Sequence, residues 1–318
     1  MNRFLPCPRC GKNIAQNPSH ADTCLGLKRR VDRYIPEPYH PEPQDIDEID
    51  EIDESEDDQE MSEMSIGMGF KCDDGIVLAA DTQHSGALKL RGEKVFEITG
   101  TPGISVCIAG AGRVSLIRKA VELIGKDVAK DGATIDMMVK VENVLTTIHQ
   151  RHIYPYKGVE ESRPSLQLLI GVWTKDAGFY LLETEHTVPN FVDDYAVIGS
   201  GGSIAEYIIK TSRGYINSTS DAKYLAAYAV AMAKTYDLFC GGETRIRTLA
   251  QGGNVGTASY EEVRDWELFF GDLLEANRMT ISGLNIEAFE DADIELLVGD
   301  YKTSLLKFRE KVRQRKKK

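Results

Sequence analysis

Short apolar runs alternate with helically spaced apolar positions along the chain from residue 65 onward. Two strand-like runs, SIGMGFKC and GIVLAAD, flank a turn at Asp73 to Gly75, and GISVCIAG is a third run. SLQLLIGVW and FYLLETE flank a second turn at Asp176 to Gly178, and YAVIGSGG ends in a third turn. Pairs of short strands are therefore predicted in two separate parts of the chain.

Stripes of apolar residues with helical spacing follow each group of strands. The stripes, each predicted to be the buried face of a helix, are Val114, Ile117, Val121 and Ile124; Ile135, Met138, Val141, Leu145 and Ile148; and Leu225, Ala229, Met232 and Tyr236. Strand pairs, two helices, strand pairs and two helices form an α+β pattern. This order suggests two sheets packed face to face with helices outside.

The segment before residue 65 has a different composition. Between Glu37 and Glu63 lie fourteen acidic residues and no Lys or Arg, so the net charge of −12 belongs to this stretch. Such a repetitive, self-repelling segment cannot bury enough surface to fold alone, and it is expected to be a solvated tether. The sequence divides into a small module at 1–30, a disordered linker at 31–64, a main domain at 65–300 and a basic tail at 301–318.

Three of the six cysteines lie in the first 24 residues, together with one histidine. Cys7 and Cys10 are separated by two residues, and His20 and Cys24 by three. Four such ligands can surround a tetrahedral Zn²⁺ with no open position, which predicts a structural zinc site rather than a catalytic one. Scattered thiols are the alternative. Metal binding would supply most of the folding free energy of so small a module.

The zinc-ligand segment CPRCGKNIAQNPSHADTCL resembles the small ubiquitin-binding zinc fingers. Asp22 falls where that family places an acidic contact to ubiquitin, although the spacing between Cys10 and His20 is a residue or two short. The resemblance implies ubiquitin or a ubiquitin-like protein as a partner. A nucleic acid is the other partner class considered for this module.

Five separated blocks of the main domain resemble, in order, the proteasome β-type family of N-terminal-nucleophile hydrolases. The blocks are GFKCDDGIVLAADTQHSG, EKVFEI, CIAGAG, YAVIGSGGSIAEYIIK and YDLFCGG. The resemblance covers about Ser65 to Gly241 and implies a four-layer αββα sandwich. It also implies a polypeptide substrate and assembly into rings with copies of the chain or with related subunits.

The chemistry of such a site can be argued from the residues. A hydroxyl on the first residue of a chain has a general base built in, because its α-amine, with a pKa of about 8, is partly neutral at physiological pH. A nearby lysine favours the neutral amine and stabilises an oxyanion, and an aspartate orients that lysine.

The resemblance assigns these roles to particular residues. Ser65 matches the nucleophile, Lys94 the catalytic lysine and Asp81 its partner. Gly110 matches the residue whose N–H forms an oxyanion hole. The pair that hydrogen-bonds the amine corresponds to Ser200 and Asp237, and Cys240 stands where that motif more often has serine.

Two features argue against simple catalysis by the full-length chain. The family nearly always has threonine, preceded by glycine, where this chain has Ser65 preceded by Met64. Because the nitrogen of Ser65 is an amide in the full-length chain, we expect no activity there until Ser65 becomes an N-terminus. A catalytically silent scaffold, whose zinc finger is the working part, is therefore the competing hypothesis.

The remaining sequence features concern location and the C-terminus. No run approaches the roughly eighteen apolar residues of a membrane span, and no secretory signal is recognised, so a cytoplasmic or nuclear location is expected. The tail KFREKVRQRKKK is basic. A frayed helix, a contact for an acidic surface or nucleic acid, and a nuclear address all fit it.

Overall fold

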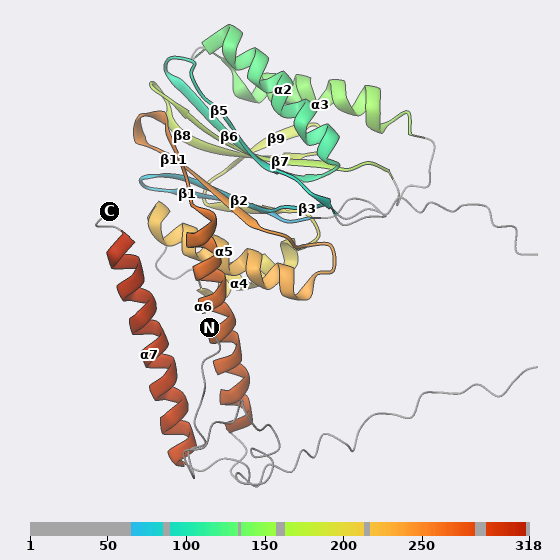
Figure 1. Cartoon of the computed structure of the whole chain (residues 1–318). Coiled ribbons are helices and arrows are strands. Elements are labelled where there is room, and N and C mark those ends of the chain that lie inside the picture. Colours follow the sequence, from blue (N-terminus) through green and yellow to red (C-terminus); the bar gives the residue numbers. More distant parts are fainter. Residues whose placement is uncertain are drawn as a thin grey trace, which may run out of the picture. The chain divides into compact units, whose positions relative to one another are not determined.

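The computed structural model describes residues 65–84, 90–132, 135–156, 163–212, 217–283 and 291–315 (Figure 1). The chain divides into two compact units, residues 1–57 and 58–318, and the described residues all belong to the second. The predicted zinc ligands Cys7, Cys10, His20 and Cys24 lie outside the described residues, as does the acidic segment.

Two five-stranded antiparallel sheets form the centre of this unit. The first contains, in spatial order, β10 (Tyr195–Ile198), β1 (Gly67–Cys72), β2 (Gly75–Asp81), β11 (Thr244–Ala250) and β12 (Asn254–Thr257). The second contains β5 (Val95–Ile98), β6 (Ile104–Gly112), β7 (Leu166–Thr174), β8 (Gly178–Glu185) and β9 (Val188–Val192). A short ribbon pairs β3 (Gln83–His84) with β4 (Leu90–Arg91).

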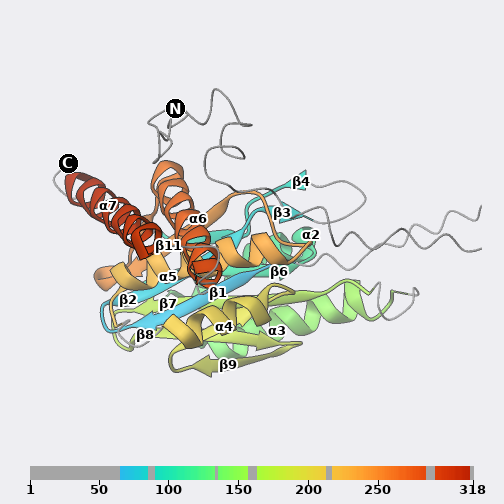
Figure 2. The same cartoon turned by 90° about the horizontal axis from the view of Figure 1, so that it is seen from below.

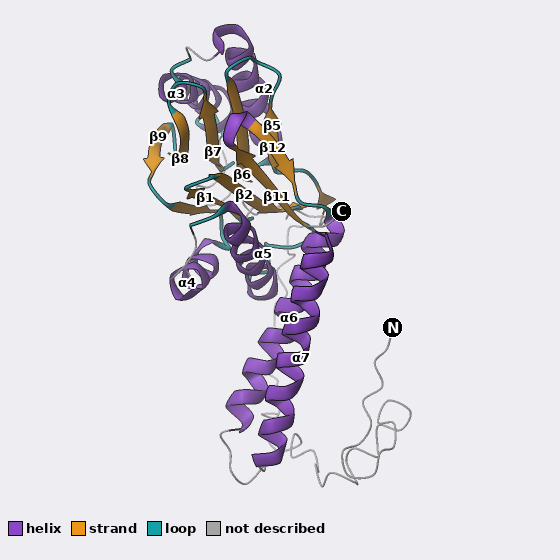
Figure 3. Cartoon of the chain, turned by 90° about the vertical axis from the view of Figure 1, so that its left-hand side faces the viewer, coloured by secondary structure: helices purple, strands orange, loops and turns teal. Residues whose placement is uncertain are grey.

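Helices cover the outer face of each sheet (Figures 1 and 2). The second sheet is covered by α2 (Val114–Asp131) and α3 (Met137–Ile148), and the first by α4 (Gly202–Ser212) and α5 (Thr219–Tyr236). A π-helical turn, His149–Ile153, follows α3. Helix, sheet, sheet, helix is the four-layer αββα sandwich predicted from the sequence. Two more helices, α6 (Tyr260–Gly283) and α7 (Asp291–Arg315), end the chain (Figure 3).

The continuous apolar run of β2 follows from burial on both faces. Val77 and Ala79 pack toward α4 and α5, whereas Ile76 and Leu78 pack between the two sheets. A strand that faces water on one side would alternate apolar and polar residues, and β2 has no such side. The central strands and their covering helices thus bury three apolar layers, which hold the ends of β1 and β2 in fixed positions.

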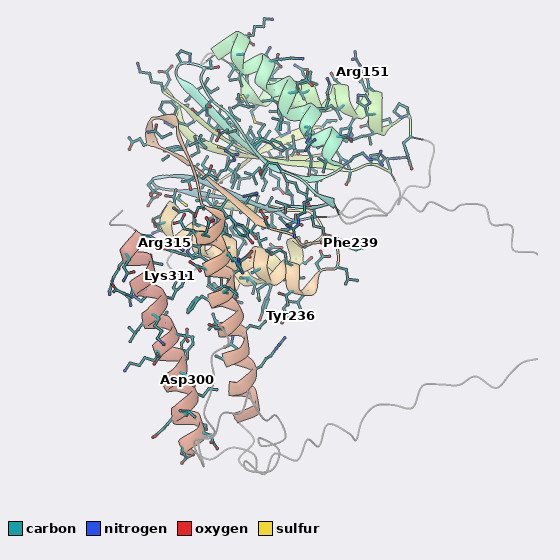
Figure 4. All side chains as sticks on the ribbon, in the orientation of Figure 1. Arg151, Tyr236, Phe239, Asp300, Lys311 and Arg315 are labelled. Carbon is teal, nitrogen blue, oxygen red and sulfur yellow. The ribbon has the colours of Figure 1, made fainter. Side chains whose placement is uncertain are left out.

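Two predictions about helices need correction. Tyr236 is 56% exposed at the end of α5, while the other positions of its stripe are buried (Figure 4). The helix ends at this residue, and its side chain is left exposed to solvent. The boundary predicted between residues 300 and 301 falls inside α7, because apolar residues continue at helical spacing, as at Leu305, Phe308 and Val312. The described part of the basic tail is therefore helical.

The strands β3, β4, β5, β9, β11 and β12 and the helices α6 and α7 are elements that the apolar pattern did not predict. Among the helices of the described residues, none combines the length and hydrophobicity that crossing a membrane requires.

Candidate active site

The hairpin of β1 and β2 brings the predicted nucleophile beside its predicted partner. Ser65 directly precedes β1, and Asp81 is the last residue of β2. The register pairs Gly67 with Ala80, and the Asp81 N–H donates to the Ile66 carbonyl at 3.3 Å. The Ser65 hydroxyl then donates to Asp81 Oδ1 at 3.1 Å. The sixteen-residue separation of Ser65 and Asp81 is therefore the length of one antiparallel hairpin, which brings its two ends together.

Lys94 reaches this pair from the second sheet. It directly precedes β5, and its ammonium nitrogen donates to Ser65 Oγ at 2.7 Å and to Asp81 Oδ1 at 2.8 Å. Nζ also donates to the backbone carbonyl of Gln83. These three acceptors match the three N–H donors of an ammonium group. The positive charge of Lys94 is thus held against the serine oxygen on which negative charge would develop.

The carboxylate of Asp81 is buried and accepts several hydrogen bonds. Its Oδ1 accepts from the Ile66 N–H at 3.3 Å in addition to Ser65 and Lys94, and its Oδ2 accepts from the Gly241 N–H at 2.9 Å. Asp81 and Lys94 both have 0% exposure. A buried charge is tolerated when it is paired and hydrogen-bonded, and this pair meets both conditions.

Gln83 and Gly241 position this pair and were not singled out from the sequence. The Gln83 N–H donates to the Gly241 carbonyl at 3.1 Å, so the two segments that hold Lys94 and Asp81 are tied to one another. A side chain on Gly241 would collide with Gln83, whose Oε1 lies 2.2 Å from the ideal Cβ position. The Gly-Gly pair that closes the YDLFCGG block was the available signal.

The backbone N–H of Gly110, the predicted oxyanion donor, takes part in strand pairing in this structure. The Gly110 N–H donates to the Lys94 carbonyl at 3.0 Å, so it already serves the pairing of β6 with the segment that enters β5. A Cβ at this position would lie 2.6 Å from Ile117 Cγ2 of α2, which explains why glycine is present. Stabilisation of an oxyanion by Gly110 would require this hydrogen bond to be shared or broken.

Ser200 lies near the backbone of Ser65. Its hydroxyl donates to the Ser65 carbonyl at 3.4 Å, and the Gly201 N–H points to the same oxygen at 3.4 Å. Gly199 has φ +87°, and a Cβ there would lie 2.1 Å from the Ser65 carbonyl oxygen. The Gly-Ser-Gly-Gly turn is therefore shaped by close contact with the first residue of the main domain.

The two remaining predicted residues lie in the turn after α5. Asp237 accepts from the Phe239 N–H at 2.8 Å and from the Cys240 thiol at 3.5 Å. Burial, followed by the charges of Asp81 and Asp237, raises the pKa of the Cys240 thiol far above its usual range. Cys240 is also buried, so its thiol is shielded from solvent. The structure assembles Ser65, Asp81 and Lys94 in direct contact, with Ser200, Asp237 and Cys240 around them.

A surface cleft of about 230 Å³ lies next to Asp81 and Lys94, whose sequence neighbours Thr82 and Glu93 help to line it. It is lined by Thr82, Arg91, Gly92, Glu93, Glu243 and Arg245. Glu243 pairs with Arg245 at 2.8 Å and with Arg91 at 3.6 Å, so the charges in its wall are balanced. The part of the chain that the structure describes holds no group of three or more His, Cys, Asp or Glu residues placed to bind a metal ion.

Comparison with known proteins places this arrangement in a family. The proteasome subunit family matches residues 65–249. Proteasome subunit beta 1 of Thermococcus onnurineus is 28% identical over 193 residues, which cover 58% of this chain and 88% of that protein. Proteasome subunit beta 2 of Pyrococcus furiosus is 26% identical over 205 residues, covering 63% and 91%.

Solved structures agree with the fold. An Anbu (Gly-1) mutant from Hyphomicrobium sp. strain MC1 superposes with a TM-score of 0.56 at 14% identity and covers 69% of this chain and 99% of its own. Anbu, an ancestral beta-subunit, from Yersinia bercovieri gives 0.54 at 13% identity and covers 67% and 96%. At such low identity the likeness concerns the fold alone.

Proposed function

Because the chain belongs to the proteasome subunit family, we propose that it is an N-terminal-nucleophile peptidase with Ser65 as the nucleophile. The observation that supports this proposal is the buried contact of Lys94 Nζ with both Ser65 Oγ and Asp81 Oδ1, at 2.7 and 2.8 Å. The contact holds a positive charge beside the oxygen on which negative charge would develop during attack.

In the proposed reaction, the free α-amine of Ser65 accepts the hydroxyl proton while Oγ attacks the carbonyl carbon of a peptide bond. The amine then gives that proton to the leaving nitrogen, and an ester to Ser65 remains. Water attacks the ester and returns a proton through the same amine, which releases the acid and restores serine. Lys94 stabilises negative charge on Oγ and on the tetrahedral intermediate throughout.

The full-length chain is proposed to be a latent form. Ser65 is 1% exposed, and its hydroxyl donates to Asp81 rather than to an amine. A freed N-terminus would have to turn the hydroxyl toward its own nitrogen. Serine lacks the methyl group that would restrict this rotation. The residue can therefore be reoriented once Met64 is removed, either by self-cleavage or by translation from Met64 followed by methionine trimming.

We propose that the N-terminal module is a tethered recognition unit for this peptidase. Three cysteines and one histidine supply the soft donors that a closed tetrahedral zinc site requires, and Cys7, Cys10, His20 and Cys24 would hold the ion. The zinc would be structural, and ubiquitin or a ubiquitin-like protein is its proposed partner. This unit would bring substrates to a cytoplasmic or nuclear peptidase.

Assembly with copies of the chain or with related subunits is also proposed. Its relatives are named as proteasome subunits, and one structural neighbour is described as a helical assembly of the Anbu complex from Pseudomonas aeruginosa, with a TM-score of 0.54. The competing function, a silent scaffold with a working zinc finger, is favoured by the amide nitrogen of Ser65 in the full-length chain.

The peptidase and the scaffold are distinguished by comparing the full-length chain, a short chain begun at Met64, and two variants of the short chain. A chain begun at Met64 is expected to lose that methionine and hydrolyse peptides, whereas an unprocessed full-length chain should be much less active. Ser65→Ala should abolish hydrolysis in the short chain, and Ser115→Ala, at an exposed position of α2, should leave it unchanged. Intact mass reports the N-terminus. A short chain that begins at Ser65 and hydrolyses no peptide would support the scaffold, and equal activity of an intact full-length chain would move the nucleophile elsewhere.

A further inference from the structure

Helix α7 packs on α6 along one face only. Its half-buried residues include Leu297, Leu305, Phe308 and Val312, which repeat at helical spacing. Phe308 stacks on Phe269 of α6 with ring centroids 4.4 Å apart. Near its C-terminus, Lys311 and Arg315 pair with Asp265 of α6, and Figure 4 shows both side chains on this end of the helix. These contacts fix which face of α7 remains open.

The open face carries a second stripe. Ala292, Leu296, Gly299, Thr303, Leu306 and Glu310 recur at alternating steps of four and three residues, and all six are exposed. Leu296 and Leu306 are 54% and 55% exposed. A Cβ added to Gly299 would meet no atom within 4 Å, and the Thr303 hydroxyl already donates to the Gly299 carbonyl at 2.8 Å. This spacing is that of one helix packed on another, with small residues at its centre.

Charge is divided between the two halves of α7. Residues 291–300 contain four acidic residues and no basic one, whereas residues 301–315 contain six basic residues and one acidic. Acidic residues in the first turn and basic residues in the last turn are favoured by the helix dipole in any helix. That effect is confined to the end turns and does not account for Asp300, Lys302 or Lys307 in the middle. The division favours a partner helix of the same sequence running antiparallel.

We infer that α7 is the contact site for α7 of a second copy of this chain, with the two helices antiparallel and related by a twofold axis that crosses the open face at the level of residue 301. This register places Leu296 of one copy opposite Leu306 of the other and Gly299 opposite Thr303. The open stripe is symmetric about Tyr301, so each contact occurs twice, as a twofold interface requires.

Flanking charges support the same register. Asp293 comes opposite Lys307 of the second copy, and Glu295 comes opposite Arg309, so symmetry gives four pairs of opposite sign. Asp300 and Lys302 lie nearest the axis, where each meets its own copy and repels it, so the electrostatic preference for this register comes from the four outer pairs. A parallel arrangement would instead place like charge against like charge along the whole helix. The contact lies outside residues 65–249, the part that matches the proteasome subunit family, and it does not rest on the proposed activity of Ser65.

Particle mass tests the contact in the full-length chain. Leu296→Glu combined with Leu306→Glu should lower the mass measured by light scattering or sedimentation, to half where α7 joins two equal halves of the particle. Leu268→Glu, at a 60% exposed position of α6 outside the stripe, is the matched control and should leave the mass unchanged. Circular dichroism checks that the helices are retained. An unchanged mass of the folded double variant would overturn the proposal.

Charge reversal separates a lost contact from a damaged helix. Asp293→Lys with Glu295→Lys should dissociate the particle, and adding Lys307→Glu with Arg309→Glu should restore it, because opposite charges again meet. Failure of this restoration in a folded chain would refute the antiparallel pairing.

Cysteine crosslinks test the register. Chains with Leu296→Cys and chains with Leu306→Cys, mixed and oxidised with diamide, should form a disulfide between positions 296 and 306, identified by mass spectrometry of the linked peptides. Either variant alone should give no disulfide at its new cysteine. Linkage of position 296 to itself, or no linkage in the mixture, would refute the proposed register.

Discussion

The buried pair of Lys94 and Asp81 makes a quantitative prediction about stability. Lys94→Met keeps the length of the side chain and removes its charge. The Asp81 carboxylate would then remain in a site with 0% exposure, with the Ser65 hydroxyl and the N–H groups of Ile66 and Gly241 as its partners. Three neutral donors do not replace a cation at 2.8 Å.

Breaking a buried pair by removing one partner typically costs about 3–5 kcal/mol. For a domain of this size, that cost lowers the melting temperature by roughly 6–20 °C, at about 2–4 °C per kcal/mol. Asp81→Asn should cost a similar amount, because it leaves the lysine without its counter-charge. The double variant contains no buried charge, so its cost should be smaller than the sum of the single costs by about 1–3 kcal/mol.

Urea unfolding followed by tryptophan fluorescence measures these differences. The chain has two tryptophans, Trp173 in β7 and Trp266 in α6. Lys210→Met is the control, because Lys210 pairs with Glu206 on the surface and such pairs contribute about 0–1 kcal/mol. Equal costs at positions 94 and 210, or strictly additive costs in the double variant, would refute this account of the site.

Three further predictions follow from single features. Gly199→Ala should destabilise the domain and displace Ser65, so the short chain should lose peptide hydrolysis. Gly256→Ala is the control, because a side chain there meets open space and should change neither stability nor activity. Urea unfolding measures the stability, and peptide hydrolysis measures the activity. Burial lowers the pKa of His149, whose ring nitrogens have no hydrogen-bond partner among the described residues, so the unfolded chain binds protons more readily. Stability should therefore fall as the pH drops below about 6.5, and His149→Phe should flatten that dependence; an unaltered pH profile would contradict it. Metal analysis should find about one Zn²⁺ per chain. Replacing the first and last of the four ligands by serine should remove it without changing the urea midpoint of the sandwich.

Strands buried on both faces could be predicted because nothing interrupts their apolar run, as in β2. The neighbouring strand β11 is also central, yet its sequence TRIRTLA places two arginines among the apolar residues. Arg247 donates to the Val95 carbonyl at 3.1 Å and pairs with Glu97, so its charge is met by residues 150 positions away in the sequence. No local pattern contains those partners, and the strand was missed for that reason.

Gly110 shows a second limit of sequence reasoning. A resemblance can identify a position, but it cannot say where a backbone N–H points, because that depends on which strand lies beside it. Here the segment that enters β5 accepts that hydrogen bond, and Ile117 fills the space that a side chain would need. Packing against Ile117 already requires a glycine at this position. The contacts of Ser65, Asp81 and Lys94 were more predictable, because each residue lies at the end of a strand or directly before one.

The buried pair of Lys94 and Asp81 also bears on whether this site is catalytic or only structural. Replacing a buried ion pair by apolar residues of similar volume often leaves stability unchanged or raises it by about 1–4 kcal/mol. A chain that needed only a scaffold could therefore hold neutral residues here, such as methionine at position 94 and asparagine at position 81. The amide oxygen of asparagine can still accept from the N–H groups of Ile66 and Gly241. The pair that is present places a cation 2.7 Å from a serine oxygen, an arrangement that gives little stability and does lower the energy of an alkoxide. Lys94→Met with Asp81→Asn should then lose less stability than the sum of the two single losses, because no buried charge remains, while the short form hydrolyses no peptide. A loss as large as that sum would instead assign the pair to the fold and favour the scaffold.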